Sequence, residues 1–279
     1  MIELRQTFPL GELLQMTGLA KSTFYYQRKE LSAGDKYAEA KQAISRIYHE
    51  HNGRYGYRRI TAALAQQGLR LGHNLVQRLM GKMGLKSLVR PKKYRSYKGE
   101  MGTAAPNHLE RNFHASEVNQ KWATDVTEFN VAGEKVYLSP LMDLCNGQII
   151  AYETAPRPAF AMVKKMLDAG LATLRNGERP ILHSDQGWQY RMPLYRETLQ
   201  QEGVVQSMSR KGNCHDNAAM ESFFAVLKSE YFYLNKFASV AQFLTGLAEY
   251  IRYYNNDRIK LKLNGMSPVQ YRTHLSMAS

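Results

Sequence analysis

The chain has 279 residues and 44% of them are hydrophobic, which is enough to bury a core and to form one to three domains. Its 38 Lys and Arg against 24 Asp and Glu give a formal net charge of +14, which predicts a polyanionic partner. With only two cysteines and no apolar run near the ~18 residues of a membrane span, we expect neither a disulfide framework nor a transmembrane protein.

The positive charge is concentrated in the first part of the chain. Residues 1–118 hold 20 Lys and Arg against 9 Asp and Glu, whereas residues 119–279 hold 18 against 15. An anionic membrane surface would attract the same charge, but the basic segments are broken by turns and lack a long amphipathic face. The asymmetry therefore predicts a DNA-binding first part and a body that uses its carboxylates for another purpose.

A helix-turn-helix is predicted near the N-terminus, in a domain of residues 1–32. Three leucines mark the apolar face of one helix, a glycine-containing turn follows, and Ser22 or Thr23 is expected to cap a second helix. The layout is typical of DNA-binding proteins. The exposed polar residues expected at DNA are Lys21, Thr23 and Tyr25.

A second helical module is predicted over residues 33–88. Apolar residues at helical spacing indicate helices over Tyr37–His51 and Tyr57–Gln67, and Asn74 is expected to cap a third helix. One of the two helix-turn-helix candidates could instead serve only for packing. The side chains of this module expected at DNA are Arg58, Arg59, Asn74, Arg78 and Lys82.

Residues 89–117 are predicted to form a basic linker. No acidic residue lies within the segment 86–99, and Tyr94 and Tyr97 lie between its charges. Such a segment can follow a phosphate backbone, and the alternative is a solvated linker without a fixed partner. The residues expected to contact DNA here are Lys92, Lys93 and Arg95.

From residue 118 to residue 234 the pattern changes to strands and helices, and residues 235–279 read as helical. This order of elements predicts an α/β layer fold. The predicted elements are strands over residues 122–129, 136–142 and 148–154, a helix over 160–175, a strand over 180–184, a helix over 194–202, a strand over 204–207 and a helix over 216–230.

Three acids occupy unusual positions in this region. Asp125 is expected in the middle of a strand, Asp185 at the end of a buried strand, and Glu221 inside a helix with apolar neighbours. A single carboxylate is usually a surface charge or part of an ion pair, but carboxylates at strand ends and on an adjacent helix can converge on one point. Three like charges need a cation to stay ionised together, and oxygen ligands select Mg²⁺ or Mn²⁺. Two such ions would activate an attacking oxygen and stabilise a leaving oxygen at phosphorus.

Other residues near these acids are candidates for the same site. His183 either borders the site or packs in the core, and Asp216 is interpreted as a helix N-cap. Trp188 and Tyr190 can stack on DNA bases, although packing over the core is the commoner fate of such residues. A polar loop before the Glu221 helix either follows a phosphate backbone or is a plain surface loop. Its residues expected at DNA are Arg210, Lys211, Asn213 and Asn217.

The three acids stand in long sequence motifs. These read Trp-Ala-Thr-Asp-Val-Thr-Glu-Phe around Asp125, His-Ser-Asp-Gln-Gly-Trp-Gln-Tyr around Asp185 and Asp-Asn-Ala-Ala-Met-Glu-Ser-Phe-Phe around Glu221, with 35 residues between the last two acids. The chain also holds Gly-Arg-Tyr-Gly-Tyr-Arg-Arg-Ile before the core and Tyr-Tyr-Asn-Asn-Asp-Arg near the end. Over nearly its whole length it resembles DDE-type bacterial insertion-sequence transposases with a retroviral-integrase-like core, and specifically the second-reading-frame product of copy-out-paste-in elements.

The resemblance implies an RNase-H-like core, with a mixed central sheet flanked by helices, preceded by all-α helix-turn-helix modules. It implies that the three acids bind two Mg²⁺ (or Mn²⁺) ions and that the protein nicks the element's end and transfers the freed 3′-OH, giving a circular intermediate that later integrates. Lys228, on the same helix face as Glu221, is implied to contact DNA.

The resemblance also implies partners and a location. We expect the protein to bind terminal inverted repeats and target DNA, to act as a homo-oligomer that bridges two ends, and to work with the leucine-zipper product of an upstream frame. The expected location is the bacterial cytoplasm, at the nucleoid.

Two other functions stay open at the level of sequence. A non-catalytic DNA-binding repressor or transposition inhibitor would bind element ends without metal, and the intact set of three acids disfavours it. A hydrolytic nuclease would use the same acids without joining strands, and the paired helix-turn-helix modules disfavour it.

Overall fold

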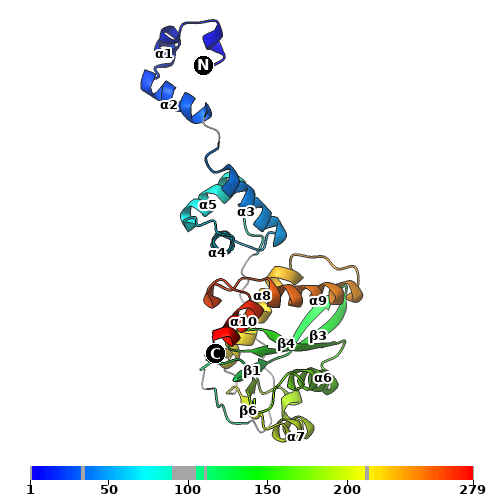
Figure 1. Ribbon diagram of the computed structural model, residues 1–279. Coiled ribbons are helices and arrows are strands. Elements are labelled where there is room, and N and C mark those ends of the chain that lie inside the picture. Colours follow the sequence, from blue (N-terminus) through cyan, green and yellow to red (C-terminus); the bar gives the residue numbers. More distant parts are fainter. Residues whose placement is uncertain (1, 33–34, 90–104, 110–111, 211–213, 279) are drawn as a thin grey trace.

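A computed structural model describes residues 2–32, 35–89, 105–109, 112–210 and 214–278 of the chain. A pair of helices near the N-terminus is followed by a three-helix module and then by a core built on a six-stranded sheet (Figure 1). The predicted class, a mixed sheet flanked by helices and preceded by all-helical modules, is confirmed. Within these ranges, none of the helices combines the length and the apolar character that crossing a membrane requires.

The N-terminal module is small. It contains a 3₁₀ turn η1 (Leu4–Gln6) and the helices α1 (Leu10–Thr17) and α2 (Lys21–Ser32). Leu13 of α1 and Phe24 of α2 are buried at 6% and 4% exposure, so one apolar side chain from each helix forms the contact. The helix-turn-helix pattern in the sequence therefore corresponds to two helices around a turn.

The second module has a core of its own. It contains the helices α3 (Ala38–Glu50), α4 (Tyr57–Gln66) and α5 (His73–Lys82). Their apolar residues repeat at helical spacing, so each helix presents one face to a shared centre. The buried side chains of that centre include Ile44, Ile47, Tyr55, Ile60, Leu64, Val76 and Leu79.

The helix caps predicted for these two modules are wrong. Helix α2 begins at Lys21, so Ser22 and Thr23 lie inside its first turn instead of preceding it. Helix α5 has Gly72 as its N-cap without a side-chain hydrogen bond, so Asn74 lies one position inside the helix. The short polar residues lie within the first turns, which is why the pattern placed the helices correctly but the caps two or three residues late.

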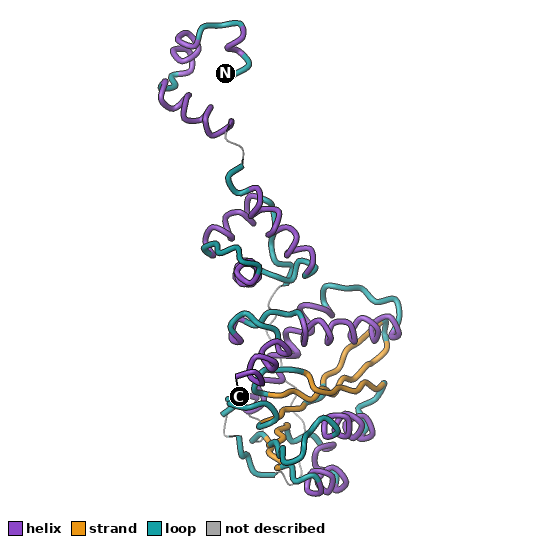
Figure 2. The backbone as a smooth tube through the Cα atoms, viewed as in Figure 1, coloured by secondary structure: helices purple, strands orange, loops and turns teal. Residues whose placement is uncertain are grey.

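The sheet of the core has the strand order β2-β3-β1-β5-β6, and β4 pairs with the long central strand β3. Figure 2 shows these strands between helices of the core. Strands β1, β2 and β4 run antiparallel to β3, whereas β5 runs parallel to β1 and β6 parallel to β5. The strand bounds are β1 Lys121–Thr124, β2 Thr127–Val131, β3 Glu134–Asp143, β4 Ile149–Ala155, β5 Ile181–Ser184 and β6 Val205–Met208.

Helices cover both faces of this sheet. Helices α6 (Phe160–Leu171) and α7 (Pro193–Gln201) pack against one face, and α8 (Ala218–Leu227) and α9 (Val240–Asn256) against the other (Figure 1). Neighbouring residues of the central strands alternate between the two apolar clusters, because successive side chains of a strand point to opposite faces.

The extended segment predicted over residues 122–129 is interrupted at Asp125 and Val126. Strands β1 and β2 keep one common register along β3, which would place Asp125 opposite Pro140. The Pro140 carbonyl accepts a hydrogen bond from the Thr124 hydroxyl at 2.9 Å, so this residue faces β1, but its nitrogen has no hydrogen to donate. The expectation that Asp125 lies mid-strand is therefore wrong: Asp125 follows the end of β1, where the ladder opens.

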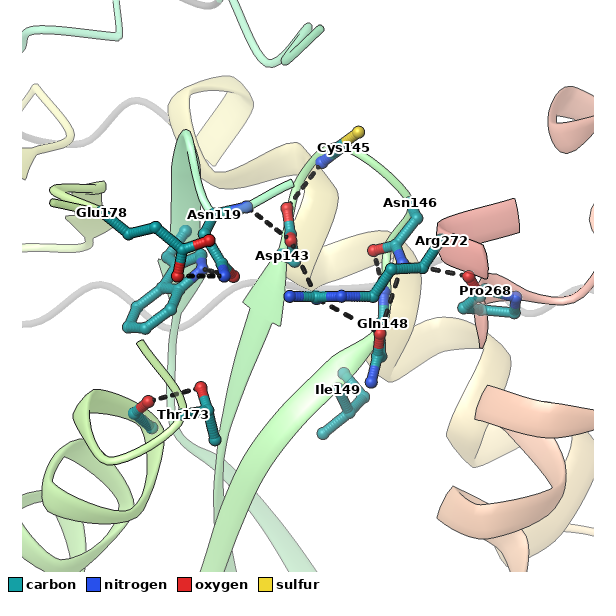
Figure 3. A network of polar contacts seen from close by, with 12 residues as sticks. Asn119, Asp143, Cys145, Asn146, Gln148, Ile149, Thr173, Glu178, Pro268 and Arg272 are labelled. Carbon is teal, nitrogen blue, oxygen red and sulfur yellow. Dashed lines mark hydrogen bonds and ion pairs between the residues drawn. The ribbon is translucent and has the colours of Figure 1, made fainter. Parts of the chain in front are cut away.

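The C-terminal helix α10 (Pro268–Ala278) is fixed to the end of β3 by a polar network (Figure 3). The guanidinium of Arg272 lies 3.4 Å from the carboxylate of Asp143, which is fully buried. The side-chain amide of Asn146 donates to the Pro268 carbonyl at 3.0 Å. Asp143 is thus a structural acid that anchors the C-terminal segment.

The turn between β3 and β4 is anchored to the same segment by a lysine. The ammonium of Lys260 donates to the Gly147 carbonyl at 3.0 Å and lies 4.7 Å from the centroid of the Tyr254 ring. Gly147 has φ +68°, and a Cβ there would collide with the Lys260 ammonium. A glycine is required at this position for both reasons.

A buried acid joins the second module to the core. Glu230 lies in the π-helical turn η4 (Lys228–Phe232) that continues α8, and its side chain is 2% exposed. Its carboxylate accepts from the Arg258 guanidinium at 2.7 Å and from Arg59 of α4 at 3.1 Å. The Tyr55 hydroxyl adds a bond of 3.1 Å to a backbone carbonyl of the C-terminal segment. The second module is therefore docked on the core by specific polar contacts.

Candidate active site

Two of the three acids lie side by side at the ends of neighbouring parallel strands. Asp125 follows β1 and Asp185 follows β5, and the register pairs Ala123 with His183. Two residues further along, the same register places Asp125 opposite Asp185. Because the carboxyl ends of parallel strands meet at one edge of a sheet, the two carboxylates open into the same space.

The third acid comes from helix α8, which packs on this part of the sheet. Glu221 lies in the first turn of α8, while Met220 and Phe224 on either side of it are fully buried against Ala123 and its neighbours. The apolar face fixes the rotation of the helix, so the half-buried Glu221 lies at the edge of the packed face, towards Asp125.

Short hydrogen bonds fix the orientation of the two strand-end acids. A carboxylate oxygen of Asp125 accepts from the backbone N–H of Val126 at 2.7 Å, and one of Asp185 accepts from the N–H of Gly187 at 2.8 Å. A Cβ on Gly187 would lie 2.9 Å from the Asp185 carboxylate oxygen, so a glycine is needed for this close approach.

The electrostatics show that the acids act on one another. Burial raises the pKa of Asp125 well above its usual value, and the charges of Asp185 and Glu221 raise it further. Burial also raises the pKa of Asp185, against the opposing effects of the Gly187 N–H and Arg191. Each carboxylate therefore resists ionisation in this site unless a positive charge joins it.

The donor set fits a hard divalent cation. It consists of carboxylate oxygens, which Mg²⁺ and Mn²⁺ prefer, and its mutual repulsion is relieved by positive charge. Within the described ranges no three His, Cys, Asp or Glu side chains already enclose a metal position. Cation binding at this site would thus draw the three carboxylates together.

Lys228 lies on the same side of the helix as Glu221. Burial lowers the pKa of Lys228, while the charges of Glu128 and Asp125 oppose that shift. Its ammonium lies 5.3 Å from the centroid of the Phe129 ring. A partly buried cation is thereby held next to the acids.

A polar cluster behind the acids positions the start of α8. His183 is fully buried, with one ring nitrogen 2.9 Å from the Ser207 hydroxyl and the other 2.8 Å from the Asp216 carbonyl. Burial lowers the pKa of His183 to about 4, so the ring is neutral at pH 7 and belongs to the core. The Asp216 carboxylate accepts from the Arg210 guanidinium at 3.0 and 3.1 Å.

This cluster corrects the interpretation of Asp216 as a helix N-cap. The N-cap of α8 is Asn217, and Asp216 is 1% exposed and ion-paired instead. The sequence reasoning missed this support for Glu221. The signal that could have found it is an acid and an arginine six residues apart, on either side of a glycine-containing loop.

The structure changes several predicted DNA contacts in the core. Tyr190 is fully buried in the cluster under α7, so its ring cannot stack on bases, whereas Trp188 is 48% exposed. Asn217 is 5% exposed, and neither atom of its side-chain amide has a hydrogen-bond partner among the described residues, so it does not present a polar group to the surface. Arg210 is exposed at the rim. The predicted contacts Lys211 and Asn213, and the linker residues Lys92, Lys93 and Arg95, lie outside the described residues.

In the helical modules one predicted DNA contact is redirected. The Arg59 side chain is 25% exposed and paired with Glu230, so it serves the junction with the core. The other predicted side chains of both modules lie on exposed surface, and they are Lys21, Thr23, Tyr25, Arg58, Asn74, Arg78 and Lys82.

Comparison with known proteins matches family models to the second helical module and to the core. An HTH-like domain model matches residues 36–93, and integrase core domain models match residues 115–214 and 221–275. The chain is 53% identical to the putative transposase InsK for insertion sequence element IS150 of Escherichia coli K12, over 99% of this chain and 97% of that protein. It is 40% identical to the probable transposase for insertion sequence element IS1353 of Shigella flexneri, over 99% of this chain and 54% of that protein, so it spans about half of that relative.

A solved structure gives a weaker likeness. The HTLV-2 integrase catalytic core domain in complex with magnesium aligns with a TM-score of 0.44 and 14% identity, over 56% of this chain and 97% of that one.

Proposed function

The chain belongs to the DDE-type insertion-sequence transposases, which are polynucleotidyl transferases, and on that basis we propose that Asp125, Asp185 and Glu221 are its catalytic carboxylates. The observation that carries the proposal is the parallel register of β1 and β5, which sets Asp125 opposite Asp185 at one sheet edge. Helix α8 adds Glu221 to the same place, and the pKa of Asp125 is raised by burial together with the charges of Asp185 and Glu221.

The same three residues would hold the metal. Their donor chemistry suits two Mg²⁺ or Mn²⁺ ions, which when bound would activate an attacking oxygen and stabilise a leaving oxygen at phosphorus. The protein's own part is to fix the carboxylates by the Val126 and Gly187 amides and to exclude water on the buried side. Both nicking at an element end and transfer of the freed 3′-OH are in-line displacements, so one site serves both.

Lys228 and the helical modules would hold the DNA. The Lys228 ammonium next to the acids is placed to bind a phosphate oxygen near the reacting bond. Exposed polar residues of α2 and α5 would contact the terminal inverted repeats. A homo-oligomer would bridge two ends, and the joined ends would form the circular intermediate before integration into target DNA. The product of an upstream frame would be a further partner.

The experiment that tests this function is a metal-dependent joining assay. Purified protein is mixed with labelled duplexes of the element's own ends and Mg²⁺, and nicked and joined strands are separated by size. Glu221→Gln should abolish both products and leave end binding intact, because only the charge of one carboxylate is removed. Glu197→Gln, an exposed acid on α7, is the matched control and should react like the wild type.

The outcomes separate the alternatives. Normal nicking by Glu221→Gln would contradict the site. End binding by the wild type without any metal-dependent product would instead support a non-catalytic inhibitor, whereas nicking without joining would support a hydrolytic nuclease.

A further inference from the structure

A cleft of about 590 Å³ separates the second helical module from helix α8. Residues of α4 and of the segment before it form one wall, and α8, η4 and the C-terminal segment form the other. Both walls are held in place by the buried contacts of Glu230, so the cleft is a fixed feature of the junction between the module and the core.

The lining carries an excess of positive charge. Arg54, Arg58, Arg59 and Arg258 face it with a single acid, Glu230. Both oxygens of Glu230 are engaged by Arg258 at 2.7 Å and one also by Arg59, so its charge is neutralised locally. Four arginines against one carboxylate leave a net charge of +3, and Arg54 and Arg58 are the two arginines that do not bond to the Glu230 side chain.

These two guanidinium groups lie near aromatic rings, and each donates one hydrogen bond through its Nε, Arg54 to the Glu230 carbonyl at 3.0 Å and Arg58 to the Tyr57 hydroxyl at 3.2 Å. The guanidinium carbon of Arg54 lies 4.9 Å from the centroid of the Tyr253 ring, and that of Arg58 lies 5.7 Å from the ring of Tyr57. A guanidinium supported in this way loses little freedom when it binds a planar or tetrahedral anion. The hydroxyl group of Ser222 in the opposite wall adds a further donor.

Helix α8 connects this cleft with the three acids. An α-helix turns by about 100° per residue, so Ser222 lies about a quarter turn away from Glu221 on α8. The cleft and the three acids thus lie against adjacent faces of α8, and the second helical module lies on the far side of the cleft.

We propose that this cleft binds the phosphodiester backbone of the element end, in the stretch between the base pairs contacted by the second module and the bond that is cut. The proposal rests on the proposed function and adds a site to it. Arginine forks and hydroxyl donors suit phosphate oxygens, and the two walls belong to the parts of the protein that must engage one DNA segment at once. The cleft would set the distance between recognition and cutting.

The test is a phosphate-neutralisation scan of the element-end duplex, in which single phosphates are replaced by methylphosphonates. Binding is measured without metal for the wild type, for Arg58→Gln and for the control Arg46→Gln, an exposed arginine of the same module that bonds to Gln67 at 2.7 Å. Arg58→Gln should weaken binding by about tenfold and reduce the slope of log K against log salt by about 1. Binding by Arg58→Gln should also no longer respond to neutralisation of one phosphate in the predicted stretch. Arg58→Lys should restore part of the slope of log K against log salt.

Each outcome decides the proposal. If Arg58→Gln and the wild type lose the same affinity at every neutralised phosphate, or if Arg46→Gln behaves as Arg58→Gln does, the cleft does not bind the backbone. If the scan gives the expected pattern but no metal-dependent joining occurs, the catalytic function fails and the cleft assignment holds.

Discussion

Replacing Glu230 with Gln removes the negative charge that Arg59 and Arg258 share at the junction of the second module and the core. The carboxylate is 2% exposed and the Arg258 side chain 5%, so water cannot replace the lost partner. Removing one partner of a buried ion pair costs about 3–5 kcal/mol, and the amide retains one acceptor, so about 3 kcal/mol is expected. For a domain of this size that corresponds to a fall in Tm of roughly 6–12 °C.

The stability lost in Glu230→Gln should also depend on pH. Burial alone would raise the pKa of Glu230, but the Arg258 and Arg59 guanidinium groups outweigh it and hold the pKa below the usual 4.5. A carboxyl group with a depressed pKa contributes stability above the pKa of the unfolded chain and loses it as the pH falls through the folded value. The difference in Tm between wild type and Glu230→Gln should therefore be full at pH 7 and shrink below pH 4.5.

Thermal unfolding of the two proteins across pH, followed by circular dichroism, measures both effects. The matched control is Glu128→Gln, since Glu128 pairs with Lys135 at 3.2 Å on the surface, where the two side chains are 43% and 59% exposed. That change should cost less than about 1 kcal/mol. If Glu230→Gln is as mild as the control, or if its effect grows as the pH falls, the reasoning about the buried junction is wrong.

Two further changes test features of the core. Tyr190→Phe should weaken Mn²⁺ binding, measured by calorimetry, by about tenfold, because the buried Tyr190 hydroxyl lies within the field of Asp125 and Asp185, the proposed metal ligands. The control Tyr195→Phe removes an equally buried hydroxyl that has no acid nearby and should leave the affinity unchanged, so equal affinities of the two variants would contradict this prediction. Gly147→Ala should lower the free energy of unfolding by about 2 kcal/mol, because residue 147 has a positive φ and a Cβ there displaces the Lys260 ammonium. The control Gly133→Ala has a positive φ but no atom near its Cβ, so it should cost less in the same unfolding experiment. An equal cost for the two variants would show that Lys260 moves freely.

The sequence predicted the elements because local patterns determine them. The helix expected over Tyr37–His51 is observed as Ala38–Glu50, since its apolar residues repeat at the spacing of one buried face. The proximity of Asp125 and Asp185 was inferred as convergence at strand ends, but the register that sets them opposite each other depends on pairing across 60 residues of chain. No local pattern contains that information.

The errors have a common cause. Asp216 has the residue type and position of an N-cap, yet its carboxylate accepts hydrogen bonds from Arg210 and from the distant Asn107 instead. Tyr190 follows the second acid by five residues and looks like a surface aromatic, but the 3₁₀ turn after Asp185 directs it into the core. In each case a partner from elsewhere in the fold overrides a local preference.

Pro140 links the register of β1 and β2 on β3 to the position of Asp125. The hairpin between β2 and β3 closes over two residues with positive φ, Ala132 and Gly133, so the turn leaves no slack for a shift. A slip of β3 by two positions would place Pro140 opposite a strand residue whose carbonyl then has no N–H to accept from. It would also place Asp125 opposite a residue that can hydrogen-bond to the Asp125 backbone. An insertion or deletion in this turn should therefore cost folding and catalysis together, which makes the hairpin a poor site for accepting extra sequence.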